Sequence, residues 1–350
     1  MLVPVLNEAE MIRDTVAHMQ AQRFDGRLEF IFVDGRSRDG TREILRELAG
    51  RDARIRVLDN PARRVPQALN VGLRNSTGEY VVRMDAHTRY PPEYIDAGVR
   101  RLQRGDVDWV SGPQLAVAAG PWSRRVAMAL RSRLGVGGAS FRLATDQEID
   151  VDTGFTGIWR RGTLEVHEGW DEGWPVNQDA ELAARIRAAG GRIVCIPEMA
   201  ASYVPRESLV ALARQYYSYG MYRAKTSHRH PESMRRSQAL PPALVVALAG
   251  ALVGPARVRR ALRVPVGAYA VVVVVESVRQ AEPGRRLDAA LLPAVFATMH
   301  LAWGSGFIEG SRRFGLPLAA LARALRPASP PRRVPGLTPA PTGRIATDDR

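Results

Sequence analysis

The stretch "YVVRMDAHTRY", residues 80–90, begins as an apolar run and ends in polar side chains just before Pro91 and Pro92. The apolar part predicts a buried strand, and Asp85 and His87 follow it two residues apart. In α/β sheets, ligands bind beyond the carboxyl ends of the strands. Because Asp-x-His also occurs in solvated turns, the stretch alone leaves two possibilities open, a metal or ligand site and a simple turn.

Short apolar runs alternate with helical patterns over the first 115 residues. The predicted strands are "LVPVL" (2–6), "LEFIFVD" (28–34), "RIRVLDN" (54–60), "EYVVRMD" (79–85) and "VDWVSGP" (107–113). Such alternation is typical of βαβ units. It predicts an α/β fold with a mostly parallel sheet and helices on both faces.

Capping residues indicate where the first helices begin and end. Asn7 and Glu10 have the spacing of a capping box, so we expect the first helix to be capped by Asn7. A second helix is expected at 41–49, with Gly50 as its stop.

The middle of the chain has a less regular pattern. Residues 115–175 read as irregular and rich in glycine, arginine and tryptophan, and the elements expected after them are a helix at 178–189, a strand in "RIVCIP" (192–197) and a helix at 207–222. Cys195, the single cysteine, lies in that strand and is expected to be a packed core thiol.

The charge of the chain is strongly positive, at a formal +14, and Lys225 is the only lysine. This skew towards arginine is more typical of coding bias than of function. No helix-turn-helix, zinc-finger or RNA-binding pattern accompanies it, so we expect no nucleic-acid partner. Anionic lipid and phosphate-bearing ligands remain possible partners. The amino terminus lacks the pattern of a secretory signal, which predicts a cytosolic start.

The composition changes beyond about residue 236. Residues 237–256 and 289–308 contain no charged side chain, and arginine clusters lie between and around these stretches. A membrane span needs about 20 apolar residues, so membrane contact is expected, with a buried helical core as the alternative. Pro241, Pro242 and Pro293 leave the number of true spans open.

Five motifs follow in order along the chain, namely "PVLNEAE", "VDGRSRDGT", "RRVPQALNVGL", "RMDAH" and "NQDAEL". This order resembles the family 2 glycosyltransferases of GT-A fold. Within them the sequence is similar to the succinoglycan biosynthesis glycosyltransferase group, through "VDG-S-DGT", "VP-ALN-G", "RMDAH--YP", "GVGGA-FR", "NQD-EL--R" and "RQY--YG". The resemblance covers about residues 1–315.

The resemblance implies three parts of the chain. Residues 1–235 would form the GT-A catalytic domain, a Rossmann-like, mostly parallel sheet with flanking helices. Residues 236–325 would form a hydrophobic, membrane-associated helical region, and 326–350, which are proline-rich, a disordered tail.

The resemblance also implies a nucleotide-sugar donor site at the strand ends. Asp34, at the end of the second strand, would accept the N3–H of a uracil. The other residues assigned to the donor are Pro4, Asn7, Glu8, Arg64, Asn70, Asp85, Arg214 and Gln215. Arg63 competes with Arg64 for the diphosphate. Asp39 and Thr41 have two candidate roles, namely contact with the donor and capping of the following helix, and the capping role is at least as well supported.

A divalent cation, Mn²⁺ or Mg²⁺, is the cofactor that the family pattern implies. Asp85 would hold it, so that the cation neutralises the leaving diphosphate. His87 stands where the family often has a second aspartate, and imidazole is a poor ligand for Mg²⁺. His87 therefore has two candidate roles, as a metal ligand or as a donor to phosphate.

Asp179 matches the position of the family's general base, which takes the proton from the acceptor hydroxyl. The alternative is an acidic residue favoured by the helix dipole. Glu181 is expected to form a salt bridge instead. Arg214 and Gln215, in "RQYYSYG", resemble a motif near the donor phosphates and acceptor, with packing of an aromatic helix as the alternative.

Together these observations predict an inverting glycosyltransferase at the plasma membrane, with its catalytic domain on the cytoplasmic face. It would move a sugar, from UDP-hexose or a related donor, to a lipid-linked saccharide in surface polysaccharide assembly. Two rivals remain: a GT-A-like nucleotidyltransferase, and a membrane protein that binds nucleotide-sugar or lipid without catalysis.

Overall fold

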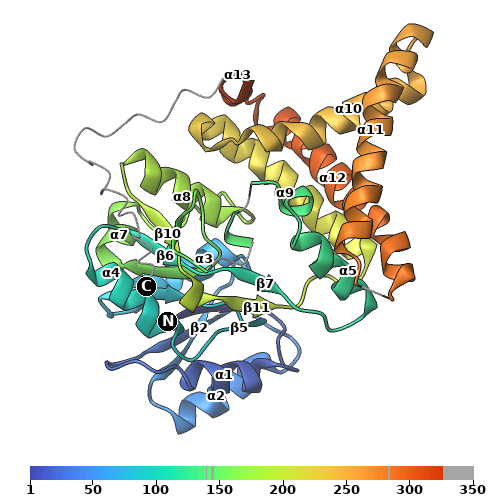
Figure 1. Cartoon of the computed structure of the whole chain (residues 1–350). Helices are drawn as coiled ribbons and strands as arrows, with labels where there is room; N and C mark the ends of the chain where they lie inside the picture. Colours follow the sequence, from blue (N-terminus) through green and yellow to red (C-terminus); the bar gives the residue numbers. More distant parts are fainter. Residues whose placement is uncertain (139, 143–145, 283, 326–350) are drawn as a thin grey trace, which may run out of the picture.

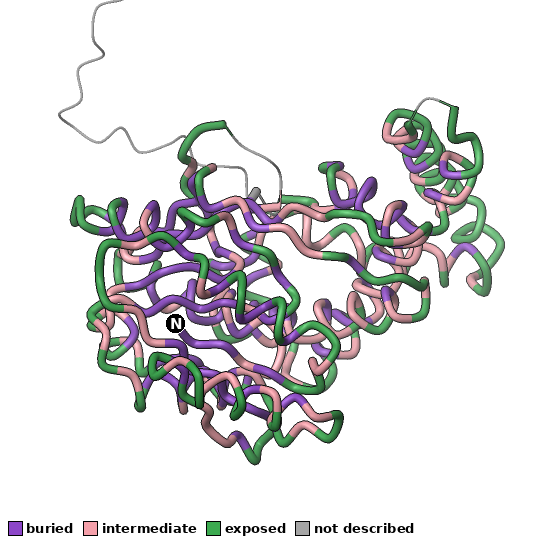
Figure 2. Tube along the Cα trace, turned by 90° about the horizontal axis from the view of Figure 1, so that it is seen from below, coloured by how far each residue is buried: buried purple, intermediate pink, exposed green. Residues whose placement is uncertain are grey.

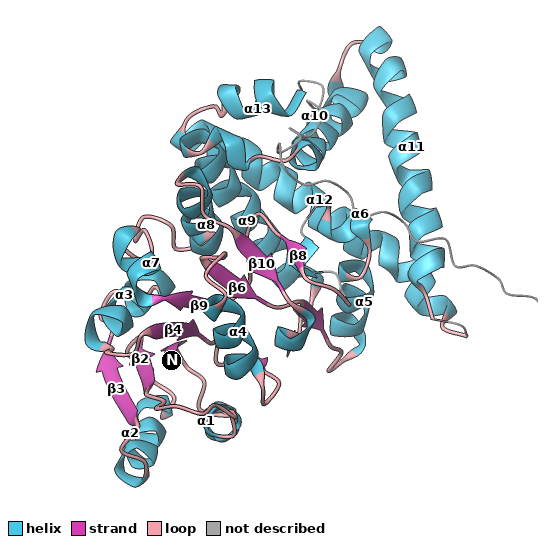
Figure 3. Ribbon diagram, turned by 60° about the vertical axis from the view of Figure 1, so that its left-hand side comes forward, coloured by secondary structure: helices cyan, strands magenta, loops and turns pink. Residues whose placement is uncertain are grey.

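An eight-stranded sheet runs through the amino-terminal part of the chain (Figure 3). In this computed structural model, which describes residues 1–138, 140–142, 146–282 and 284–325, the strand order is β3-β2-β1-β4-β9-β6-β10-β8. The strands are β1 (Leu2–Val5), β2 (Phe30–Asp34), β3 (Ile55–Asp59), β4 (Tyr80–Arg83), β6 (Trp109–Ser111), β8 (Ile149–Asp150), β9 (Gly157–Arg160) and β10 (Ile193–Cys195). The tail expected at 326–350 lies outside the described residues.

The sheet is mostly parallel, as predicted. β3, β2, β1 and β4 are parallel neighbours, and so are β6 and β10. β9 was not foreseen, because residues 115–175 read as irregular; it lies antiparallel between β4 and β6. Its four residues contain only a short apolar core, Ile158 and Trp159, and both are fully buried. Cys195 is a buried free thiol, as expected.

Alternating side chains of the strands face two hydrophobic layers. Val3 and Phe32 pack with residues of α1 (Ile12–Gln20), α2 (Thr41–Arg51) and α4 (Tyr94–Gln103). Leu2 and Ile31, one residue away on the same strands, face the helices of the other layer, α3 (Val65–Asn75), α7 (Arg161–Val166) and α8 (Gln178–Ala188). Because strand side chains alternate between faces, a buried strand needs both layers, and helices cover both faces as predicted.

A small second sheet fixes the turn after β4. It has the order β5-β11-β7 and consists of β5 (Thr88–Arg89), β11 (Ala201–Tyr203) and β7 (Gln114–Ala116). β5 pairs antiparallel with β11. The segment that begins "RMDAH" is therefore tied to a strand more than 100 residues further along the chain.

Several predicted helix boundaries are wrong. α1 begins at Ile12 rather than beside Asn7, whose φ of 57° and side-chain bond to the Arg38 amide place it in a separate loop. The capping box is thus absent. α2 continues through Gly50 to Arg51, since a single glycine costs a helix only about 1 kcal/mol. The expected helix at 207–222 is the longer α9 (Leu209–Arg229).

Four helices follow α9, and they lie to one side of the sheet (Figure 1). They are α10 (Leu240–Val253), α11 (Ala256–Gln280), α12 (Arg286–Phe314) and α13 (Leu318–Leu325). Before them, α5 (Pro121–Leu130) and α6 (Arg133–Val136) lie within the region expected to be irregular. In the described chain, three stretches are long and apolar enough to cross a membrane: Arg236–Val253, Ala256–Gln280 and Arg286–Phe314. The buried shares of these stretches are 6%, 11% and 39%, and Figure 2 shows the contrast with the sheet, which is mostly buried.

α9 and α12 pack with their backbones in direct contact. A Cβ built on Gly306 would lie 2.0 Å from the carbonyl oxygen of Tyr217, and one on Gly310 would lie 2.2 Å from that of Met221. On the other helix, a Cβ on Gly220 would lie 1.9 Å from the carbonyl oxygen of Trp303. Small residues of this kind allow close helix packing in membrane proteins. They join the helical region to the sheet through α9.

We expect Gly306→Ala to lower the stability of the full-length protein by about 1–3 kcal/mol, because the added methyl group overlaps the α9 backbone. The control is Gly267→Ala in α11, where a Cβ meets nothing within 4 Å. There alanine should be neutral or stabilising by up to about 1 kcal/mol. Thermal unfolding in detergent measures both, and equal effects of the two substitutions would contradict the packing.

Candidate active site

Two carboxylates share one buried guanidinium at the carboxyl end of β4. Arg83 donates from Nε and Nη2 to the two oxygens of Asp85, at 3.0 and 3.2 Å, and from Nη1 to Asp179 Oδ1 at 2.5 Å. Arg83 ends β4, and Asp179 is in the first turn of α8. The tertiary structure thus joins two predicted site residues that lie 94 positions apart.

Burial determines the electrostatics of this group. Arg83 is 5% exposed, and the side chains of Asp85 and Asp179 are 14% and 17% exposed. Burial raises the pKa of Asp179, and the charge of Asp85 adds to this effect, while Arg83 opposes it. Although burial acts against its charge, Arg83 has a raised pKa because both carboxylates are close. Asp179 is therefore a carboxylate of raised basicity held beside a permanent cation.

A cradle of backbone and hydroxyl contacts holds the loop after β1. The amides of Asn7 and Glu8 donate to Ser37 Oγ (2.9 Å) and Thr41 Oγ1 (2.8 Å), and the Ala9 amide donates to Asp39 (3.0 Å). Asp39 Oδ1 also accepts from the Thr41 hydroxyl at 2.6 Å. Asp39 and Thr41 thus have structural partners, in line with the structural alternative for these two residues.

The remaining residues assigned to this edge lie at the ends of β1 and β2. Pro4 is paired with Val33 in the sheet. Asp34 is fully buried, and its Oδ1 accepts from the hydroxyl (2.6 Å) and amide (3.2 Å) of Ser37. These residues, with Asn7, Glu8 and Asp85, follow neighbouring parallel strands, where α/β folds bind ligands.

His87 is half-exposed and lies near Glu8, with 3.8 Å between Nδ1 and Glu8 Oε1. The Glu8 carboxylate raises the pKa of His87 most, and Asp85 adds to this, against burial and Arg206. His87 therefore lies near two carboxylates, and both of its candidate roles, as a metal ligand and as a donor to phosphate, stay predictions.

The fit of a divalent cation depends on Asp85. Among the residues that the structure describes, there is no cluster of three or more His, Cys, Asp or Glu side chains that could hold a metal. Mg²⁺ is commonly bound by one or two carboxylates together with substrate phosphates. Asp85 fits this second kind of site, in which the donor's diphosphate would supply other ligands.

Both polar atoms of the Asn70 side chain are hydrogen-bonded within the protein. Its Nδ2 donates to the Trp170 carbonyl (2.8 Å) and to Glu172 (3.1 Å), and its Oδ1 accepts from the Trp170 amide (3.0 Å). Asn70, assigned to the donor from the sequence, anchors the loop before α8 in this structure. The reason is that the loop's buried backbone groups need partners.

Within the described residues, no hydrogen bond or ion pair joins Arg214 or Gln215 to the carboxylates of Asp85 and Asp179. Arg214 lines an open groove between α9 and α12 with Tyr217 and Leu301. Gln215 donates to the hydroxyl of Tyr219 at 3.0 Å. Arg64 is exposed at the start of α3 and is free to face a ligand at the strand ends.

Arg83 is the residue that sequence reasoning missed. The sequence signal for it was an arginine inside an otherwise apolar run, two residues before Asp85.

Glu181 forms the expected salt bridge. Its side chain is fully buried and lies 2.7 Å from Arg185. Trp159 and Trp170 are buried core residues.

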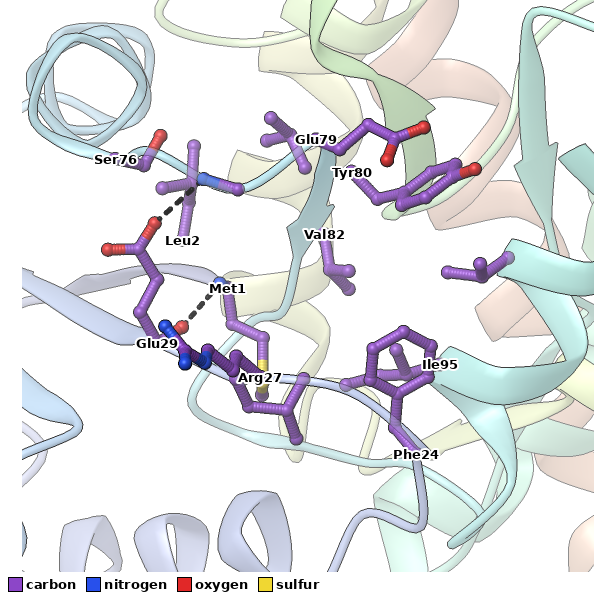
Figure 4. Close-up of a pocket in the computed structure, with 14 residues that line it drawn as sticks. Met1, Leu2, Phe24, Arg27, Glu29, Ser76, Glu79, Tyr80, Val82 and Ile95 are labelled. Carbon is purple, nitrogen blue, oxygen red and sulfur yellow. Dashed lines mark hydrogen bonds between the residues drawn. The ribbon is translucent and has the colours of Figure 1, made fainter. Parts of the chain in front are cut away.

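A separate pocket lies at the opposite, amino end of the strands (Figure 4). The Met1 ammonium donates to the Glu29 carbonyl at 2.6 Å, and burial lowers its pKa to about 6. Glu29 in turn accepts from the amides of Thr77 (2.7 Å) and Gly78 (3.1 Å). Because β1 and β4 are parallel, this pocket is separated from Asp85 by the length of both strands.

Comparison with known proteins identifies the class of this site. A model of the family described as "Glycosyl transferase family 2" matches residues 1–165. The succinoglycan biosynthesis protein ExoA of Rhizobium meliloti (strain 1021) is 33% identical over 308 residues, 87% of this chain and 92% of that protein. The dolichyl N-acetyl-alpha-D-glucosaminyl phosphate 3-beta-D-2,3-diacetamido-2,3-dideoxy-beta-D-glucuronosyltransferase of Methanococcus voltae is 24% identical, over 63% of this chain and 70% of that protein.

Among solved structures, the mannosyltransferase PcManGT from Pyrobaculum calidifontis, in complex with GDP-Man and Mn²⁺, has a TM-score of 0.52. It is 20% identical and covers 85% of this chain and 84% of that one. The fold is therefore that of the GT-A class. The chain belongs to glycosyltransferase family 2, in the succinoglycan biosynthesis group, as its ordered motifs predict.

Arg83→Met should move the acid limb of the pH–activity profile to higher pH. If Asp179 is the base, it works only when ionised, so activity should be lost as the pH falls through its pKa, and without Arg83 that pKa should rise further. The control is Arg101→Met, which removes another buried arginine that pairs with two carboxylates, Asp106 and Glu148. It should change stability without moving the limb. If the acid limb of the pH–activity profile is unchanged in both variants, Arg83 does not control the ionisation of Asp179.

Proposed function

We propose that this protein is an inverting glycosyltransferase that moves a hexose from a UDP-sugar to a lipid-linked saccharide during surface polysaccharide synthesis. The observation that carries the proposal is the Asp85–Arg83–Asp179 group at the carboxyl edge of the sheet. Support for the substrate classes comes from the relatives, one named for succinoglycan biosynthesis and one for a dolichyl-linked sugar phosphate.

The donor binds along the ends of β1, β2 and β4. Asp34 holds the uracil, the loop with Asn7 and Glu8 contacts base and ribose, and Pro4 shapes the adjoining edge. Arg64 and His87 offer positive charge to the diphosphate, as the raised pKa of His87 allows. When bound, a divalent cation held by Asp85 would neutralise the charge that develops on the leaving diphosphate.

Asp179 takes the proton from the acceptor hydroxyl as its oxygen attacks the anomeric carbon. A bond forms between that oxygen and the anomeric carbon, and the bond from the carbon to the diphosphate oxygen breaks on the opposite face. The nucleoside diphosphate leaves with the electron pair, and the proton passes from Asp179 to water. Arg83 fixes the orientation of Asp179 throughout, because its other nitrogens are held by Asp85.

The helical region places this chemistry at a membrane. α10, α11 and α12 insert in the plasma membrane, and the catalytic domain, residues 1–235, lies on its cytoplasmic face. The length and apolar character of these three stretches support their insertion.

Asp179→Asn tests the proposed reaction, because it keeps the shape of the side chain and removes its basicity. Sugar transfer should fall by roughly 10²-fold or more, while UDP affinity measured by calorimetry stays near that of the parent. The control is Asp171→Asn, which removes a carboxylate that pairs with exposed Arg229 and should retain activity. If the Asp179 variant transfers sugar as fast as the parent, another residue is the base. If neither protein transfers sugar, the chain is the rival, a membrane protein that binds nucleotide-sugar or lipid without catalysis.

Asp85→Asn should lower transfer by orders of magnitude and weaken its dependence on divalent cations, because the leaving diphosphate loses its neutralising partner. The measurement is the rate of transfer against Mn²⁺ and Mg²⁺ concentration after chelation. Full parent activity in excess chelator would contradict the metal role.

A further inference from the structure

Three arginines lie outside the site described above: two are close enough for the charge of one to act on the other, and the third lies near Tyr219, which is one turn of α9 away from one of those two. They are Arg142, Arg223 of α9 and Arg235, which precedes α10; we call them the arginine cluster. Asp152 lies among them, with 2.8 Å between its Oδ2 and the Nε of Arg235. The cluster therefore holds three guanidinium groups and one neighbouring carboxylate.

Arg223 is the least compensated member. It is 8% exposed, and within the described chain no carboxylate lies within 4.0 Å of its guanidinium. Burial, and then the charge of Arg235, lower its pKa to about 10. Among the described residues, the Nη1 atom of Arg235 is also buried without a hydrogen-bond partner. Because burying an unpaired charge is costly, such a pair is explained by an anion that binds between them.

Tyrosine hydroxyls extend the cluster along α9. Arg142 donates from Nη1 to the hydroxyl of Tyr203 at 3.1 Å. Tyr216 and Tyr219 lie close enough to raise the pKa of Arg142, and Tyr219 is one turn of α9 before Arg223. Guanidinium and phenolic groups are suited to phosphate oxygens, which accept several hydrogen bonds at once.

The position of the cluster connects it to both halves of the molecule. Asn177, two residues before Asp179, donates from Nδ2 to the Tyr219 carbonyl at 2.9 Å. On the other side, α9 packs along α12, and Arg235 lies five residues before α10 (Figure 1). An anion in the cluster would thus lie between the candidate base and the helices suited to a membrane.

We propose that the arginine cluster binds the diphosphate of the lipid-linked acceptor, with the lipid on the side of α10 and α12 and the sugar towards Asp179. This inference rests on the proposed function and deepens it. Three guanidinium groups against one carboxylate leave two positive charges, which a diphosphate would balance. The donor's diphosphate is assigned to a different place, the strand ends near Asp85 and Arg64.

The test uses the full-length protein in phosphatidylcholine nanodiscs, with polyprenyl diphosphate as one probe and UDP as the other. Arg223→Met should weaken binding of polyprenyl diphosphate by about tenfold or more and leave UDP binding unchanged. Arg223→Lys should recover part of the affinity. The matched control is Arg229→Met on the same helix, since that exposed side chain pairs with Asp171 and should affect neither probe. Inorganic pyrophosphate should compete with the lipid probe at this site.

Two results would overturn the proposal. Loss of UDP binding with intact lipid binding would assign the cluster to the donor, and unchanged binding of both probes would make it purely structural. If Arg223→Met does not fold, Arg223→Lys and Arg235→Gln are compared in its place, and full lipid affinity in both counts against the proposal. Sugar transfer to a lipid-linked saccharide is measured separately. Its absence in the parent would reject the proposed function without bearing on lipid binding.

Discussion

Arg83 is the constraint on which the arrangement of the candidate site depends. It leaves the sheet at the end of β4, is almost fully buried, and bonds to carboxylates from two distant segments. A buried guanidinium requires such partners, and each buried carboxylate requires it in return. The network therefore holds the first turn of α8 against the turn after β4. The antiparallel pairing of β5 with β11 fixes the same turn from the other side.

Charge is distributed unevenly over the two ends of this site. The strand ends carry the carboxylates of Asp34 and Asp85, which bond to Ser37 and Arg83, and that of Glu8, which lies near His87. Towards the helical region, in the arginine cluster, positive side chains outnumber negative ones. A donor and an acceptor that both carry phosphate would thus meet different surroundings on the two sides of Asp179. That difference would let one carboxylate act between two anionic substrates.

The helical region is joined to the catalytic sheet by close packing rather than by a flexible linker. α12 contacts α9 through glycines whose missing side chains let the backbones touch. A buried ion pair between Arg125 of α5 and Asp288 of α12, at 2.7 Å, adds a second connection. α10 and α11 remain largely exposed, which suits contact with lipid. The three apolar stretches are consequently connected to the candidate site through α9.

The sequence by itself determined the fold class, the ordered strands and the apolar stretches, because hydrophobic periodicity and turn residues are local signals. It also singled out Asp85 and Asp179 as candidate site residues, which stay predictions. Only the tertiary structure decided that Arg83 joins them, that Asn70 anchors a loop, and that Arg214 lies in a groove between α9 and α12. β9 escaped prediction because its place between β4 and β6 depends on pairing with distant strands. The partners of a side chain depend on contacts between remote segments, which local patterns do not specify.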